Sequence, residues 1–279
     1  MNRYFQLLVV LCGLLASTQL HAAAVGMVID LNGSAKAKLS DQNVPIDIAS
    51  PLSSGISIDI ENKAELSFVF YPTRQQFTVT GPAALMITEK AVQQTKGAAM
   101  KVENLPNHKA TASLGFQNRV VPAAMLMRTV IAKPKLLFPQ DGETIMSFRP
   151  HFAWLSDTNG MVEFSLTSSG ASLYTQRLSS EELSLPTDLV LKSGGEYRWQ
   201  IKPVTDGTGT TISGTFRVAE DALRTEVLNG RPQQQADLSE WVYYAMGLEQ
   251  ERMMTEANQI WRHLSGLRPG SKRVKSLAQ

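Results

Sequence analysis

Residues 56–70 read ISIDIENKAELSFVF, and this stretch decides the fold of the first part of the chain. Apolar side chains occupy every second position on both sides of a polar turn at residues 61–63. They are Ile56, Ile58 and Ile60 before the turn, and Ala64, Leu66, Phe68 and Phe70 after it. This alternation has the period of a half-buried strand, so two neighbouring β-strands are predicted here.

More short strands are predicted on either side of this stretch. Residues 25–31 and 34–39 flank Asn32-Gly33, which is typical of a two-residue hairpin because both residues tolerate positive φ. Residues 77–80 and 84–88 are further strands, separated by Gly81-Pro82. Short strands at this spacing predict a barrel or a solenoid-like β-domain over residues 25–105.

The spaced small and apolar residues of this region resemble the FecR-type periplasmic β-domain. The matching positions are Gly26, Val28, Gly33, Leu52, Gly55, Ile58, Ala64, Leu66 and Phe68. The chain departs from the family at its Asp-Gly turn, where residues 71–75 read YPTRQ. The resemblance implies a periplasmic domain with a link to sensing or signal relay across the envelope.

A second β-rich part is predicted over residues 134–218, after a connection at residues 106–133. Within that connection, residues 120–130 are apolar and suit either a strand or a short helix. About seven short strands with frequent turns favour an immunoglobulin-like sandwich. The pattern is similar to fibronectin type III and related immunoglobulin-like repeats of bacterial surface proteins. Trp154, Tyr197 and Trp199 occupy the aromatic positions of that pattern and are predicted to lie in the core.

The period changes to that of helices in residues 222–279. Trp241, Tyr244, Ala245 and Leu248 share one helical face, and Ala257, Ile260, Trp261, Leu264 and Leu267 share another. The spacing of the Trp, Ala, aromatic and Pro positions resembles one tetratricopeptide repeat. Met254 stands where that family has Tyr, and no Gly matches its mid-repeat turn.

A single helical hairpin of this kind cannot bury its own apolar face. It must therefore pack on the sandwich, pair with another chain, or wait for a partner. The basic end of the chain is either a solvated helix end or a contact for anionic lipid or an acidic partner. The candidate partner-binding residues are Trp241, Tyr244, Met253, Trp261, Arg268, Lys272 and Arg273.

The N-terminus has the three-part layout of a secretory signal peptide over residues 1–22, with Ala22 to Ala24 as small residues for cleavage. A periplasmic or secreted location is therefore expected. The single cysteine, Cys12, lies inside this signal, so the mature chain is expected to have no disulfide. Lipidation at Cys12 is the less favoured alternative, because Leu11 precedes it. No later stretch is apolar for long enough to span a membrane.

No motif for catalysis, a cofactor or a metal ion is found in the sequence. His108, His151 and His263 fall in three separate segments, and no Gly-x-Ser-x-Gly elbow is present. Residues 206–210 lack the repeated acidic ligands of a calcium loop. The formal net charge of +2 gives no indication of nucleic-acid binding.

The sequence therefore predicts a mainly β protein with a C-terminal α segment, exported and non-enzymatic, that binds or scaffolds in the envelope. This hypothesis requires an exposed apolar face on the hairpin, and it fails for the helices if Trp241, Met246, Met253 and Trp261 are buried. The alternative is cell-wall or carbohydrate binding, with Tyr71, Phe116, Tyr174 and Tyr243 as aromatics to line a groove. A hydrolase would need acidic groups or a Ser–His pair to converge. The oligomeric state stays open.

Overall fold

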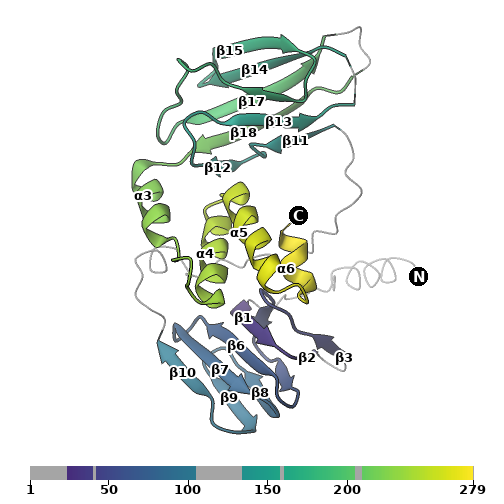
Figure 1. The fold of residues 1–279 in the computed structure, drawn as a ribbon, viewed down its shortest axis with the longest axis vertical. Helices are drawn as coiled ribbons and strands as arrows, with labels where there is room; N and C mark the ends of the chain where they lie inside the picture. Colours follow the sequence, from purple (N-terminus) through teal and green to yellow (C-terminus); the bar gives the residue numbers. More distant parts are fainter. Residues whose placement is uncertain (1–23, 40–41, 105–133, 158–159, 205–208, 279) are drawn as a thin grey trace, which may run out of the picture.

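The computed structural model describes residues 24–39, 42–104, 134–157, 160–204 and 209–278. It is mainly β with a C-terminal helical segment, as the sequence predicts. A helical unit lies between the two β-rich parts, the first below it and the second above it in Figure 1. The expected signal peptide at residues 1–22 and the connection at 106–133 lie outside the described residues.

The first β-domain consists of two five-stranded antiparallel sheets that share one core. Ile58 from one sheet and Leu66 and Phe68 from the other are fully buried in it. One sheet has the order β10 (Lys101–Asn104), β7 (Gln75–Thr80), β6 (Glu65–Phe70), β1 (Ala24–Asn32) and β4 (Pro51–Ser53). The other has the order β3 (Gln42–Pro45), β2 (Ala35–Leu39), β5 (Ser57–Ile60), β8 (Ala83–Ile87) and β9 (Val92–Lys96).

The prediction of a hairpin at Asn32-Gly33 is wrong. β1 pairs with β4 and β6, whereas β2 pairs with β3 and β5 in the other sheet. Gly33 has a φ of +93°, and a Cβ there would lie 2.7 Å from the Ala64 side chain. The positive-φ residue therefore carries the chain from one sheet to the other instead of reversing it within one sheet.

The second β-rich part is a sandwich of a three-stranded and a five-stranded sheet. Its core holds Trp154, Tyr197 and Trp199, so the predicted core position of these aromatics is confirmed. The smaller sheet is β11 (Lys135–Phe138), β13 (His151–Leu155) and β16 (Glu182–Ser184). The larger is β12 (Glu143–Ile145), β18 (Ile212–Val218), β17 (Glu196–Pro203), β14 (Val162–Ser168) and β15 (Ala171–Leu178).

The helical unit contains the hairpin α4 (Leu238–Gln250) and α5 (Met254–Leu267), as predicted from the helical period. It adds α3 (Asp221–Gly230) before the hairpin and α6 (Lys272–Leu277) after it, in the segment expected to be a basic tail. Only two residues separate β18 from α3, and one of them, Ala219, is fully buried. None of the helices in the described parts of the chain is long and apolar enough to cross a membrane.

The helical unit and the first β-domain share a hydrophobic core. Met27 and Ile29 of β1 and Val69 of β6 face the helices and are buried together with Trp261 and Leu264 of α5. β6 is therefore buried on both faces, with Leu66 and Phe68 on the inner side and Val69 on the outer side. The first and last parts of the chain consequently form one packed unit, and the sandwich lies between them in sequence.

Candidate functional site

The apolar face predicted to receive a partner is buried within the chain. Trp241 and Met246 are 7% and 8% exposed, and Met253 and Trp261 are fully buried. The prediction of an exposed apolar hairpin face is therefore wrong. The physical reason is that β1 and β6 already supply apolar side chains that cover this face.

Tyr244 is turned toward α3 and is not part of an open surface. Its ring packs edge-on against Trp241, and its hydroxyl donates a hydrogen bond to the Val227 carbonyl at 3.1 Å. Burial raises the pKa of this hydroxyl. Tyr244 therefore holds α3 against α4.

Two of the three predicted basic residues are engaged by the first β-domain. Arg268 donates to both carboxylate oxygens of Asp30, with Nε–Oδ1 at 3.2 Å and Nη2–Oδ2 at 3.0 Å. Arg273 donates from Nε to the Ala49 carbonyl at 2.7 Å. Lys272 remains exposed. The basic end is thus a folded helix bound to β1 and its neighbouring loop, and not a free tail.

A carboxylate of the first β-domain caps α6. Asp47 Oδ2 accepts a hydrogen bond from the Arg273 backbone N–H at 3.0 Å, in the first turn of the helix. The Ser271 hydroxyl accepts from Val274 N–H at the same end. Because the first N–H groups of a helix have no partner inside it, an acceptor there stabilises the helix.

A carboxylate of the sandwich caps α5 in the same way. The residue at the N-cap position of α5, Met253, offers no side-chain hydrogen bond. Instead, Glu143 Oε1 accepts from the Thr255 backbone N–H at 2.8 Å, and its Oε2 accepts from the Gln140 N–H at 2.7 Å. Glu143 is 1% exposed. The negative charge also suits the positive end of the helix dipole.

The turn between α4 and α5 is bonded to the strand that carries Glu143. Arg252 donates from Nε to the Gly142 carbonyl at 2.5 Å, and its own carbonyl accepts from Thr144 N–H at 3.0 Å. Gly142 has a φ of +70°, and a Cβ there would lie 2.5 Å from the Arg252 Nη2. The positive φ favours glycine here, and a larger residue would also displace the end of the Arg252 side chain.

Met146, just after β12, adds a second contact with α5 and extends the contact to α3. Its backbone N–H donates to Glu256 Oε1 of α5 at 3.3 Å, and its carbonyl accepts from Arg224 Nη1 of α3 at 2.6 Å. We call the contacts of residues 142–146 with Arg224, Arg252, Thr255 and Glu256 the joint. The joint combines these directional hydrogen bonds with packing of Met146 on the core of the helical unit.

The carboxylates at the joint have raised pKa values. Burial is the main cause for both Glu143 and Glu256, and hydrogen bonds from backbone N–H groups oppose it. The nearby Glu143 charge raises the pKa of Glu256 further. Burial likewise raises the pKa of Glu249, whose Oε1 accepts from Trp261 Nε1 at 2.7 Å.

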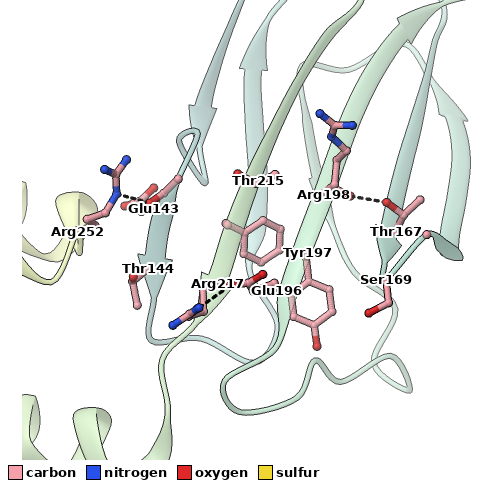
Figure 2. A pocket seen from close by; sticks show the side chains of 13 residues that line it. Glu143, Thr144, Thr167, Ser169, Glu196, Tyr197, Arg198, Thr215, Arg217 and Arg252 are labelled. Carbon is pink, nitrogen blue, oxygen red and sulfur yellow. Dashed lines mark hydrogen bonds and ion pairs between the residues drawn. The ribbon is translucent and has the colours of Figure 1, made fainter.

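An open groove of about 640 Å³ runs beside the joint, across the outward face of β12, β18, β17 and β14. Figure 2 shows Arg252 on the helical side of the groove and Arg198 and Thr167 on the opposite side. Arg217 lies between them and forms an ion pair with Glu196. The hydroxyl-bearing residues along it include Thr144, Thr167, Ser169 and Thr215.

The aromatic groove expected for carbohydrate binding is not formed by the residues named for it. Tyr71 and Tyr243 pack on the core shared by the helices and the first β-domain. Tyr174 packs against Phe164 at the edge of the sandwich core, and Phe116 lies outside the described residues. The three described positions therefore belong to two different cores and line no common groove.

The histidines are dispersed, as their positions in the sequence predict. His151 is exposed beside Ser184 and Glu182, His263 packs against Trp241, and His108 lies outside the described residues. In the described ranges, no three His, Cys, Asp or Glu residues come close enough to hold a metal ion. Glu143 and Glu256 do converge at the joint, where Glu143 is 1% exposed and the Glu143 charge raises the pKa of Glu256.

The sequence analysis missed Glu143 and Asp47, because each caps a helix more than a hundred residues away. No spacing rule connects positions so distant. A partial signal exists, because neither Met253 nor the residues just before it provide a usual N-cap for α5. A helix that lacks its own cap indicates an acceptor from elsewhere in the fold.

Comparison with models of known protein families finds no match, and comparison with curated proteins finds none either. The FecR-type, immunoglobulin-like and tetratricopeptide resemblances therefore stay predictions. The joint and the groove are the features from which a function can be inferred.

Proposed function

We propose that the protein is an exported, non-enzymatic scaffold of the cell envelope that holds two β-rich binding modules in a fixed relation. The observation that carries the proposal is the pair of helix caps that cross domain boundaries. Asp47 of the first β-domain caps α6, and Glu143 of the sandwich caps α5. The helical unit is thus fixed from both sides.

Under this proposal the helices act as a spacer, and partners bind the β-rich parts. The helical face that was expected to bind a partner is buried within the chain. Exposed apolar side chains remain on edge strands, such as Val102 on β10 and Leu173 on β15, at 43% and 40% exposure. Export is proposed on the pattern of residues 1–22, and a role in envelope sensing on the FecR-type resemblance.

The test is site-specific photo-crosslinking in cells that produce the full chain, with the crosslinker at Val102, Leu173 or Lys272. We expect the protein in the envelope fraction and a discrete crosslinked protein from Val102 or Leu173. Glu143→Ala should weaken a partner contact that needs both modules, because it loosens the joint. Crosslinks from Lys272 alone would make the helical unit the docking element and contradict the spacer role.

Cell-wall or carbohydrate binding is the second candidate, and the groove beside the joint favours it. Arginines and hydroxyl groups alternate along this groove, and both types of group bind polar sugars. Co-sedimentation with purified cell-wall sacculi tests this candidate. Retention of the protein in the pellet supports it, and an unchanged supernatant contradicts it.

A further inference from the structure

The groove beside the joint is assembled from two separate parts of the fold. Arg198 of β17, Arg217 of β18 and Thr167 of β14 come from the sandwich, while Arg252 comes from the turn between α4 and α5. Figure 2 shows these side chains spread along the groove from the helical side to β14. The groove is therefore complete only when the sandwich is docked on the helical unit.

The groove carries positive charge that the protein does not neutralise. Arg217 is paired with Glu196. Within the described chain, Arg198 and Arg252 have no ion-pair partner, and Arg252 is bonded only to the carbonyls of Gly142 and Asp141. Glu143 also lines the groove, but its two carboxylate oxygens already accept hydrogen bonds from the backbone N–H groups of Thr255 and Gln140. Two guanidinium groups therefore remain to attract an anion.

The shape of the groove suits a chain more than a small ion. From β12 to β14 it crosses three strand spacings, about 14 Å in all. The aromatic residues along it, Tyr197 and Phe216, are 5% and 2% exposed, so the groove offers no aromatic ring on which an apolar side chain could stack. A polar, extended ligand with separated negative charges matches these features better than an apolar peptide.

We propose that this groove binds a polysaccharide strand bearing carboxylates. Arg198 and Arg252 would pair with carboxylates of the strand, since a guanidinium and a carboxylate form charge-assisted hydrogen bonds. The hydroxyls of Thr144, Thr167, Ser169 and Thr215 line the path for the sugar hydroxyls. The inference rests on the second candidate function and names its ligand class.

A consequence concerns the joint. Because Arg252 belongs to the helical unit and Arg198 to the sandwich, a strand that contacts both stabilises their docking. Ligand binding is therefore expected to slow hydrogen exchange at β12 and at the turn between α4 and α5.

The test uses the full mature chain and three defined probes: a uronic-acid oligosaccharide, soluble peptidoglycan fragments and neutral dextran. The first two distinguish the sources of the carboxylate. Arg198→Gln is the main variant, since this side chain is exposed and has no ion-pair partner among the described residues. Lys202→Gln is the matched control, on the same strand and face but outside the groove.

We expect an acidic probe to bind, with the dissociation constant raised about tenfold or more by Arg198→Gln and less than about twofold by Lys202→Gln. Binding should weaken with salt, and dextran should not bind. Equal effects of the two variants, equal binding of dextran, or no binding of either acidic probe would overturn the proposal. Binding without slower hydrogen exchange at β12 would contradict the claim that the ligand contacts both the sandwich and the helical unit.

These outcomes are separate from those of the scaffold test. If crosslinks from Val102 or Leu173 persist but no saccharide binds, only the groove proposal fails. If Arg198-dependent binding is found while crosslinks are absent, the scaffold fails and the groove proposal stands.

Discussion

The two sides of the helical unit are held by different forces. Against the first β-domain, Met27, Ile29 and Val69 are buried with Trp261 in an apolar core, and hydrogen bonds to Asp30 and Asp47 add to this contact. Against the sandwich, the contacts at residues 142–146 are mainly hydrogen bonds to backbone groups and charged side chains, with Met146 also packed on the helical core. Apolar burial is non-directional and lost only when the surfaces separate, whereas water can replace a hydrogen bond.

The difference indicates a hierarchy of stability. Separating the helices from the first β-domain exposes large apolar side chains, so these two parts should unfold together. Opening the joint mainly exchanges protein hydrogen bonds for water, and each such bond contributes only about 0.5–1.5 kcal/mol net. The contact with the sandwich is therefore expected to be the weaker of the two and to open first when the protein is destabilised.

The largest effect is expected from Ile29→Ala, which removes a fully buried side chain from the apolar side. Such a truncation costs about 2–5 kcal/mol in the free energy of unfolding. Hydrogen exchange followed by mass spectrometry should then speed up in α4 and α5, although the substitution is in β1. Ile201→Ala is the matched control in the sandwich core, and it should leave α4 and α5 unchanged. If Ile29→Ala affects only the first β-domain, the shared core is not a folding unit.

The next effect is expected at the joint from Glu143→Ala. It leaves the N–H groups of Gln140 and Thr255 without their acceptor, at a cost of about 2–3 kcal/mol to the docked state. Exchange should quicken in the first turn of α5 and at β12, with the first β-domain unaffected. Glu143→Gln keeps a carbonyl acceptor, so its exchange rates should lie between those of the unsubstituted protein and those of Glu143→Ala. A loss of stability spread over the first β-domain would contradict the separation of the two sides.

A smaller effect is expected from Asp30→Asn, which weakens the pair with Arg268 on the apolar side. Both side chains are about one-third exposed, so the loss should be about 1 kcal/mol in denaturant unfolding. Arg177→Gln, which breaks the exposed pair with Glu163, serves as the control and should change less. A loss as large as that of Ile29→Ala would mean that charge, and not burial, holds this side.

The smallest effect concerns pH. Glu143 and Glu256 have pKa values raised above 4.5 in the folded state, so the folded protein binds protons more tightly than the unfolded chain above that pH. Stability should therefore fall as pH rises from the ordinary value through the raised one. Between pH 5 and pH 7 the free energy of unfolding should fall less in Glu256→Gln than in the unsubstituted protein. We expect the difference to be less than about 1 kcal/mol. A steeper slope in Glu256→Gln would contradict the assignment.

Elements with a strong local period could be predicted from the sequence, and contacts between distant elements could not. Alternation located β5 and β6, and the helical spacing located α4 and α5. The short, polar strands β3 and β10 have no such period and were missed. The Asn32-Gly33 turn was misread because its glycine suits a sheet crossing as well as a hairpin.

The candidate site was harder to predict for the same reason. The apolar face that carries Trp241 and Trp261 was predicted correctly to need a packing partner. That partner is β1, which lies more than two hundred residues earlier in the chain. Arg268 was predicted either to lie in a solvated helix end or to contact an anionic partner, and its anionic partner is Asp30 of β1 in the same chain. Sequence patterns indicate that a surface needs a partner, whereas only the fold shows that the partner is internal.

The core shared by the first β-domain and the helices also has a consequence for the order in which parts of the chain can fold. Ribosomes release the chain from its N-terminus, so Met27, Ile29 and Val69 emerge long before α4 and α5 exist to cover them. Until the last helices arrive, the first β-domain presents an apolar sheet face to its surroundings. A chain that stops before Trp261 keeps that face open, and such a surface attracts chaperones, proteases or other incomplete chains. The first β-domain is therefore expected to reach its folded state only once α4 and α5 are available to cover this face.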